Sequence, residues 1–225
     1  MFDRAAALAL LQYGDSAYPA GGFAFSWGIE GLAADGYISA PSDLDDVIDD
    51  HLSYRWALMD RPLLAEAWPA ADIEALAAID RYAEAATPSA EMREGSRRAG
   101  RALLGVSARL GRDLSLAYRA AIAAGAAHGH MPVVQAVVYR EIGVGLEAAE
   151  LLSGWTLVTG LVSAATRLGT IGHLEAQSSL AMARKRLSEL LAEPVPPGTR
   201  PASFTPMIDI AMTRGPSRHV RMFAT

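Results

Sequence analysis

A short run of aspartates is the part of this sequence most suggestive of catalysis. The run contains Asp45, Asp46, Asp49 and Asp50. This spacing places the four carboxylates on one broad face of a helix, where they could hold Mg²⁺ against a diphosphate, as in all-α prenyl-transfer enzymes. The alternative is a solvated face opposite a buried apolar stripe. No second acidic motif supplies the facing half of a metal clamp, which favours the solvated face.

Two histidines on either side of a glycine form a second candidate site. His128 and His130 fall in a predicted loop, where both imidazoles could approach one nickel or zinc ion. Stable metal sites use more ligands than two, and the sequence places no carboxylate beside this pair. We therefore treat both histidines as weak candidates for metal contact and expect no tightly bound cofactor.

A line of arginines on one predicted helix is the third feature with possible chemistry. Arg93, Arg97 and Arg101 have the spacing i, i+4, i+8, and Glu94 is placed to pair with Arg98. Such a line is most often a solvated face with ion pairs. The alternative is a docking strip for an acidic partner, because arginine is favoured at interfaces.

The composition excludes several classes of protein. The net charge of −5 gives no electrostatic footprint for nucleic acid, and the absence of cysteine excludes disulfides, cysteine-ligated zinc and cysteine nucleophiles. The longest uncharged run, residues 151–166, is shorter than a membrane-spanning helix requires, and residues 1–13 lack the features of a signal peptide. We expect a soluble cytoplasmic protein.

The elements that must position these residues are all predicted to be helices. Apolar residues follow the helical period almost everywhere, and 51% of the chain is hydrophobic. We predict an all-α, single-domain bundle of about ten helices over residues 1–192, a stiff Pro-rich linker over 193–203, and a short helix with a C-terminal tail over 204–225. The predicted helices are 2–13, 25–36, 42–56, 72–85, 88–110, 114–127, 132–152, 155–168, 174–192 and 206–212.

Local signals set several of these boundaries. Ser42 with Asp45 reads as a capping box, and Thr87 reads as an N-cap. Pro62 should bend or restart its helix. Gly100 and Gly105 lower helix propensity and are tolerable where a neighbouring helix packs closely.

A glycine motif between two predicted elements points to a different fold. Gly143, Gly145 and Ala148 spell a GxGxxA motif, but the flanking residues have helical period rather than the strand that a dinucleotide-binding turn needs. The motif alone is therefore weak support for a nucleotide site.

Residues 15–31 combine a tight turn with three aromatic side chains. Pro19, Gly21 and Gly22 mark the turn, and Phe23 is the first of the aromatics. Such a segment is either buried under helices or presented to a partner, and we favour the buried turn. The order of residues resembles the N-terminal signature of the urease accessory protein UreF family, Asp-Ser-x-x-Pro-x-Gly-Gly-Phe-x-x-Ser-x-Gly-x-Glu.

Later stretches are similar to the same family. They are the Arg-Glu-x-Ser-x-x-x-Gly-x-x-Leu-Leu pattern from Arg93, the region 164–177, the segment 205–212, and Arg221-Met222-Phe223 near the end. One departure is in the tail, where the family usually carries a His-Glu pair and this chain has Arg214-Gly215-Pro216-Ser217.

The resemblance implies a non-enzymatic urease assembly factor. Such a protein is all-α and commonly dimeric, and it scaffolds the UreD (also called UreH) and UreG accessory proteins for GTP-dependent nickel insertion into apo-urease, modulating the GTPase. Nickel would be handled by the complex. The expected surface for the UreG-type partner contains Ser26, Glu30, Arg93, Arg97 and Arg167, and the expected tail contact with the UreD-type partner contains Arg218, Arg221, Met222 and Phe223. The alternatives are a small Mg²⁺-dependent diphosphate enzyme using Asp45–Asp50 and a helical oligomer unrelated to urease.

Overall fold

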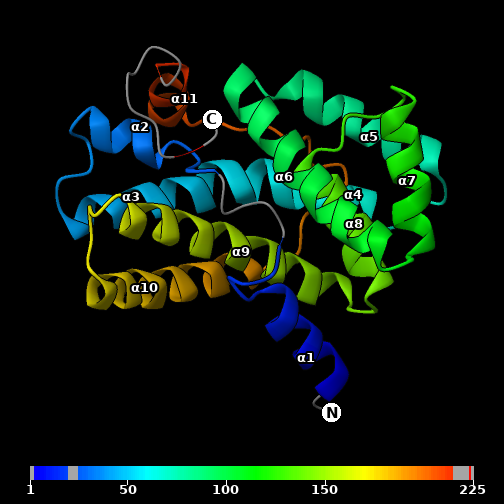
Figure 1. The fold of residues 1–225 in the computed structure, drawn as a ribbon, viewed down its shortest axis with the longest axis horizontal. Helices are drawn as coiled ribbons and strands as arrows, with labels where there is room; N and C mark the ends of the chain where they lie inside the picture. Colours follow the sequence, from blue (N-terminus) through cyan, green and yellow to red (C-terminus); the bar gives the residue numbers. More distant parts are fainter. Residues whose placement is uncertain (1–2, 20–24, 215–222, 224–225) are drawn as a thin grey trace.

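Helix α9 (Leu146–Arg167) runs through the middle of the protein, and the other helices surround it (Figure 1). The computed structural model describes residues 3–19, 25–214 and 223. Every regular element in these residues is helical, which confirms the all-α class predicted from the sequence. The other elements are α1 (Arg4–Tyr13), α2 (Ile29–Ala34), α3 (Pro41–Asp50), η2 (His51–Asp60), α4 (Arg61–Ala67), α5 (Ile73–Ala86), α6 (Ala90–Arg109), α7 (Asp113–Ala123), α8 (Met131–Glu141), α10 (His173–Leu191) and α11 (Pro206–Thr213).

Two groups of buried side chains share α9. One group lies among α2, α3, η2, α9, α10 and α11 and includes Leu44, Trp56 and Leu161. The other lies among α4, α5, α6, α7, α8 and the start of α9 and includes Leu103 and Val137. In the described part of the chain, α9 is long and apolar enough to cross a membrane, yet 56% of its apolar window is buried in the protein. We therefore read α9 as the core helix of the bundle.

Helices α3, η2 and α4 form one continuous rod rather than separate helices. The residues at both junctions, Asp50 and Arg61, have right-handed helical backbone angles. The middle segment, η2, has the wider π-helical winding. The prediction that the helix restarts at Pro62 matches the change from π to α winding at Arg61, although the rod continues without a break. Pro62 lies near the start of α4, where its ring is tolerated.

The break between α8 and α9 lies earlier than the sequence suggested. The predicted helices 132–152 and 155–168 are instead α8 and α9, and the turn lies at Gly143, whose φ is 80°. The GxGxxA motif is thus a helix-to-helix turn. Gly154, which falls between the two predicted helices, is inside α9. A Cβ there would lie 2.5 Å from Leu187 and 3.0 Å from the Trp56 ring. Its missing side chain permits close packing of α9 on α10 and η2.

Two predicted helix caps are each two residues away from the real ones. The carboxylate of Asp43 accepts hydrogen bonds from the backbone N–H groups of Ser39 and Ala40, at 2.8 and 2.9 Å, so the box predicted at Ser42 and Asp45 is wrong. Helix α3 consequently begins earlier than predicted.

The cap of α6 is also displaced. The hydroxyl of Ser89 accepts a hydrogen bond from the N–H of Met92 at 3.2 Å and is the N-cap. Thr87, the predicted cap, ends α5 instead. Both errors arise because several cap-forming side chains lie close together in the sequence, and only the path of the incoming chain decides which is used.

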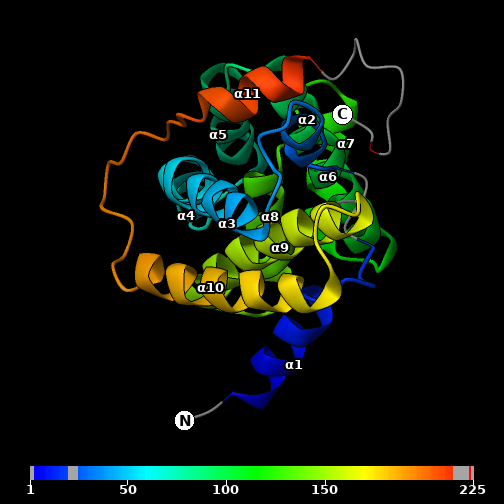
Figure 2. The same ribbon diagram turned by 90° about the vertical axis from the view of Figure 1, so that its left-hand side faces the viewer.

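The Pro-rich linker follows the surface of the protein from α10 to α11 (Figure 2). It is held to the rod and to α5. Its backbone N–H groups at Ala202 and Phe204 donate to the carbonyls of Leu58 and Tyr54, at 3.0 and 3.1 Å. The Tyr82 hydroxyl donates to the carbonyl of Pro201 at 3.0 Å. The linker therefore delivers α11 to a defined place on the bundle.

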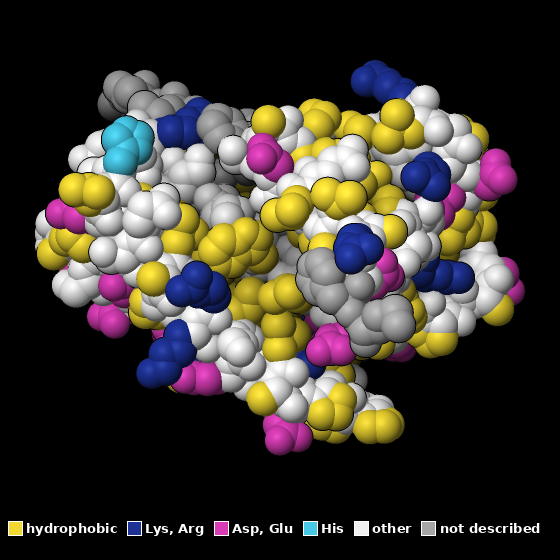
Figure 3. Space-filling view, turned by 90° about the horizontal axis from the view of Figure 1, so that it is seen from below, with side chains coloured by type: hydrophobic (Ala, Val, Ile, Leu, Met, Phe, Trp, Pro, Cys, Tyr) yellow, Lys and Arg dark blue, Asp and Glu magenta, His cyan; other side chains and the backbone are white. Residues whose placement is uncertain are grey.

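Helix α1 projects from the rest of the bundle (Figures 1 and 2). Its outer face leaves Leu8 and Leu11 exposed, at 66% and 71%. Figure 3 looks onto this side of the molecule and shows hydrophobic side chains gathered near the middle of the face, with charged side chains more scattered.

Candidate functional site

The aromatic segment near the N-terminus is a buried turn where the structure describes it. Phe25 and Ser26 are buried, at 4% and 1% exposure, and Trp27 has a left-handed backbone with φ of 51°. That conformation is uncommon for a large residue and requires support from its surroundings. Pro19, which the sequence placed in the buried turn, is exposed, whereas Gly21, Gly22 and Phe23 lie outside the described residues.

The turn leads directly into α2, against which α11 packs. A Cβ at Gly28 would lie 2.8 Å from Ile208, and a Cβ at Gly31 would lie 2.5 Å from the carbonyl oxygen of Ala211. Both glycines therefore permit the backbones of α2 and α11 to approach closely. The glycines that follow the aromatic signature thus position the C-terminal helix.

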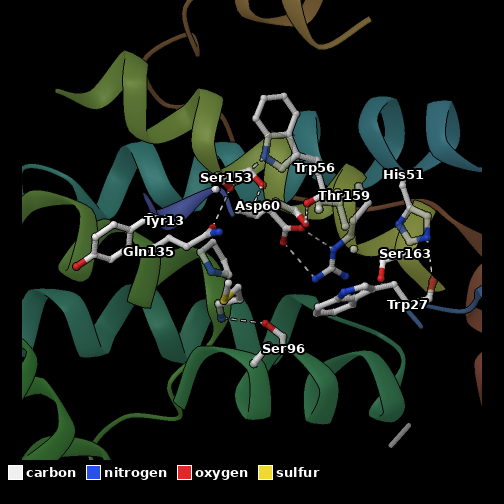
Figure 4. Close-up of a pocket in the computed structure, with 18 of the residues that line it drawn as sticks. Tyr13, Trp27, His51, Trp56, Asp60, Ser96, Gln135, Ser153, Thr159 and Ser163 are labelled. Carbon is white, nitrogen blue, oxygen red and sulfur yellow. Dashed lines mark hydrogen bonds and ion pairs between the residues drawn. The ribbon is translucent and has the colours of Figure 1, made fainter. Parts of the chain in front are cut away.

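A cavity of about 130 Å³ lies behind this turn (Figure 4). Four of its lining residues come from η2, namely His51, Arg55, Trp56 and Asp60. In an α-helix, side chains that meet are three or four residues apart. The wider π winding brings residues five apart together, and Arg55 forms an ion pair with Asp60 at 3.2 Å. The unusual winding of η2 thus builds one wall of the cavity.

The polar groups of the cavity are tied to the fold. The Nε2–H of His51 donates to the carbonyl of Trp27 at 2.9 Å, and burial lowers the pKa of His51 to about 4, so this ring is neutral at pH 7. The indole N–H of Trp56 donates to Ser153, whose hydroxyl donates to Gln135 at 2.8 Å. Within the described residues no hydroxyl group is hydrogen-bonded to a histidine ring, so the cavity shows no nucleophile–base pair.

The arginine line on α6 is largely occupied by a glutamate on α5. Arg93 and Arg97 both contact the carboxylate of Glu84, at 3.3 and 2.9 Å. The predicted pair between Glu94 and Arg98 is confirmed at 2.7 Å. The first two arginines of the line therefore hold α5 against α6. Their role in binding a partner stays a prediction.

The histidine pair also lies beside Glu84. The Nε2–H of His130 donates to Glu84 at 2.7 Å, and His128 lies 4.0 Å from the same oxygen. Burial alone would raise the pKa of the Glu84 carboxyl, but the hydrogen bond from His130 and the charge of Arg97 hold that pKa below its usual value. Among the described residues no three side chains of the metal-binding types gather closely enough to hold a metal ion.

No sequence pattern indicated which residue holds the histidine loop. The buried carboxylate of Asp80 accepts three hydrogen bonds from the backbone N–H groups of His128, Gly129 and His130, at 2.6, 2.7 and 2.9 Å. Three successive N–H groups around one carboxylate form a compact anion cradle. Gly100 completes the packing, because a Cβ there would overlap the carbonyl oxygen of Gly129. The expectation of close packing at Gly100 is confirmed.

The aspartate run on α3 is a surface feature. Leu44 and Ile48 are buried on the opposite side of α3, and Asp46 and Asp50 are exposed. Asp49 pairs with Arg186 of α10 at 2.8 Å. The geometry fits the solvated face and gives no support to the Mg²⁺-dependent alternative.

The described part of the tail returns to the body of the protein. Phe223 is 5% exposed within the core group around α9, and the guanidinium of Arg167 lies 4.4 Å from the centre of its ring. Arg218, Arg221 and Met222 lie outside the described residues. In this conformation a partner cannot contact Phe223 unless the side chain leaves its site.

The residues predicted for the UreG-type surface do not share one environment. Ser26 is buried, whereas Glu30 on α2 is half-buried and Arg167 at the end of α9 is exposed. Arg93 and Arg97 are on α6 and face Glu84. The structure thus brings Arg167 to Phe223, and Arg93 and Arg97 to one carboxylate, and the surface for a UreG-type partner stays a prediction.

Comparison with known proteins supplies the family. Residues 38–184 match the family model described as UreF. A protein named urease accessory protein UreF from Trichodesmium erythraeum (strain IMS101) is 32% identical to this chain over 222 residues, which is 96% of each chain. The chain belongs to the UreF family. The UreF resemblance noted in the sequence is therefore confirmed.

Other UreF proteins match to a similar degree. Urease accessory protein UreF from Cereibacter sphaeroides (strain KD131 / KCTC 12085) is 32% identical over 225 residues, covering 98% of this chain and 99% of the relative. The UreF protein of Paenarthrobacter aurescens (strain TC1) is 32% identical over 177 residues, covering 78% of each. The family model begins after the aromatic turn, so the first two relatives extend the similarity over the signature and the C-terminal helix.

Proposed function

We propose that this chain is a urease accessory protein that acts in urease maturation. The observation that carries the proposal is the similarity to proteins named urease accessory protein UreF over nearly the whole of both chains. The fold is compatible with this role, since the polar clusters around Glu84, Asp80 and Arg61 connect helices to one another. We assign the protein a binding role and no catalytic one.

The finer proposal concerns its partners. The chain would scaffold a UreD(H)-type and a UreG-type accessory protein on apo-urease, and nickel would pass to the enzyme as cargo of that complex. Support comes from the position of α11 on the surface beside the aromatic turn. The linker bonds and the close approach at Gly28 and Gly31 hold α11 there. The exposed residues of this C-terminal region, Phe204, Met207 and Ile210, leave apolar side chains available for contact.

We also propose a cytoplasmic homodimer. The supporting observation is the exposed pair Leu8 and Leu11 on the projecting helix α1. Light scattering on the purified chain tests this proposal, and the double change Leu8→Glu with Leu11→Glu should give a monomer. A monomeric mass for the unchanged protein would remove the dimer from the proposal.

The test of function is reconstitution with the accessory proteins of the same organism. The chain, the UreD-type protein, the UreG-type protein and apo-urease are co-expressed, and complex mass and urease activity are measured with and without nickel and GTP. We expect a co-eluting complex and activity that depends on this chain. Full activation of urease in its absence, or separate elution of all components, would contradict the proposal.

A further inference from the structure

A second hollow lies on the surface between α6 and α7. It is a groove of about 640 Å³. Helix α6 contributes one wall and α7 the other. The lining residues are Pro19, Arg101, Ala102, Leu104, Gly105, Val106, Arg109, Arg119, Ile122 and Ala123.

The charge of this groove is opposite to that of the protein as a whole. Arg101, Arg109 and Arg119 are exposed and line the groove, and no lining residue is acidic. The chain carries a net charge of −5. The groove therefore concentrates positive charge on an otherwise acidic protein, which attracts a negatively charged partner.

These arginines differ from the first part of the arginine line. Arg93 and Arg97 are neutralised by Glu84. In the described residues Arg109 and Arg119 form no ion pair, and Arg101 donates only to the backbone carbonyl of His128, at 2.9 Å. The groove thus holds guanidinium groups that no carboxylate of the chain compensates.

The floor of the groove is apolar and is opened by a glycine. Gly105 lies at i+4 from Arg101 and i−4 from Arg109, so it separates the two arginines on one face of α6. A Cβ at Gly105 would meet no atom within 4 Å, unlike the tightly packed Gly100. The close packing of a neighbouring helix that would explain a glycine in α6 is therefore absent at Gly105. Ala102, Val106 and Ile122 provide the apolar surface around it.

We propose that the α6–α7 groove binds an acidic, amphipathic segment of a partner protein. Arg101 and Arg109 are eight residues apart, about 12 Å along the helix axis. A partner helix with carboxylates two turns apart on either side of a small apolar face matches this spacing, with a third carboxylate facing Arg119. Gly105 lets such a helix lie close to α6. The inference rests on the proposed scaffold role only in taking the partner to be a protein.

The apolar floor favours a polypeptide over a nucleic acid. A phosphate backbone presents charge without an apolar face, and it gains little from Ala102, Val106 and Ile122. A peptide supplies both the carboxylates and the apolar side chains. Binding of a single-stranded RNA oligonucleotide as tightly as the peptide would overturn the assignment.

The direct test uses a fluorescein-labelled helical peptide and fluorescence anisotropy. The peptide carries glutamates at i and i+7 beside leucine and alanine, and a glutamine version of it is the uncharged probe. We expect saturable binding of the glutamate peptide that weakens with added salt, and at least about tenfold weaker binding of the glutamine peptide. Equal binding of both peptides, or of neither, would overturn the proposal.

Two pairs of variants separate the contribution of charge to peptide binding from that of groove shape. Arg109→Glu with Arg119→Glu should weaken peptide binding at least about tenfold. Arg184→Glu with Lys185→Glu is the matched control, because it makes the same change of charge at exposed positions on α10. Gly105→Ala adds a Cβ that meets no atom within 4 Å and should retain binding, while Gly105→Trp places an indole in the groove and should abolish binding. Equal loss in the α10 control would reduce the effect to overall charge and overturn the proposal.

The same variants distinguish this inference from the proposed function. In the reconstitution with UreD-type and UreG-type proteins, Gly105→Trp should lose one accessory protein from the complex while Gly105→Ala keeps both. A complete and active complex with Gly105→Trp, together with no peptide binding by the unchanged chain, would overturn the groove inference and leave the scaffold role standing. Peptide binding by a chain that joins neither accessory protein would uphold the groove and remove the scaffold role.

Discussion

The carbonyl oxygen of Leu58 accepts a hydrogen bond of 3.0 Å from the backbone N–H of Ala202. Leu58 lies in η2, four residues before Pro62, which has no N–H to donate within the helix. The linker thus adds a hydrogen bond to the rod beside Pro62. A proline inside a helix and a distant Pro-rich segment, which look independent in the sequence, therefore lie close together.

Removing this donor should release the linker. Ala202→Pro takes away the N–H and should cost about 1 kcal/mol of unfolding free energy. We expect faster proteolytic cleavage within residues 193–203, measured by limited proteolysis and mass spectrometry. Ala202→Ser keeps the N–H and is the control. Equal cleavage rates in the two variants would show that the bond does not hold the linker.

A methyl group at Gly31 should displace α11. Its Cβ would lie 2.5 Å from the carbonyl oxygen of Ala211, so the overpacking should cost about 2 kcal/mol, beyond the small gain in helix propensity. Amide hydrogen exchange should accelerate throughout α11. Gly160→Ala is the control, since its Cβ would meet only Trp27, at 3.9 Å, and stability should be unchanged or higher. Unaltered exchange in Gly31→Ala would contradict the close packing.

Replacing one partner of the buried pair Arg61 and Glu150 should cost more unfolding free energy than replacing both. The two side chains are 3.0 Å apart and 7% and 8% exposed. Arg61→Met leaves the Glu150 charge buried without a partner, and we expect a loss of about 3–5 kcal/mol in denaturant unfolding. Arg61 also donates to the carbonyls of Leu190 and Glu193, both at 2.8 Å, so that loss includes the two bonds at the end of α10.

The double change Arg61→Met with Glu150→Leu should recover most of this stability. The half-exposed pair of Arg186 and Asp49 is the matched comparison, and Arg186→Met should cost less than about 1 kcal/mol. A double variant no more stable than Arg61→Met would show that the loss comes from the α10 carbonyls rather than from the unpaired carboxylate.

His51 should make the fold sensitive to mild acid. Burial lowers the pKa of this ring to about 4, whereas the unfolded chain takes up the proton near pH 6.5. The stability that the neutral ring contributes is therefore present above pH 6.5 and is lost as the pH falls towards 4, a loss of about 3 kcal/mol.

The variant that tests this is His51→Gln, whose amide can still donate to the Trp27 carbonyl. Urea unfolding of both proteins between pH 7 and pH 4 gives the difference in their stability. We expect that difference to shift by about 3 kcal/mol in favour of the variant at low pH. Other acid-sensitive groups, including His130, are common to both proteins. A difference independent of pH would mean that His51 does not titrate as inferred.

The sequence by itself determined the features that depend on near neighbours. Helical period gave the all-α class, and the i+4 spacing of Glu94 and Arg98 predicted an ion pair that is present. The concentration of aromatic rings beside Pro19 predicted a buried turn, and the described residues Phe25 and Ser26 are buried. Such relations require only the geometry of one helix or one turn.

Tertiary structure decided the features that join distant residues. Asp80 binds the N–H groups of a loop about fifty residues away, and Glu84 rather than solvent meets Arg93 and Arg97. The two α6 glycines illustrate the same limit, since Gly100 is packed against the histidine loop and Gly105 opens a groove. Their local sequences give equal expectations, and the difference arises from where the neighbouring helices cross, which is set by the packing of side chains across the whole bundle.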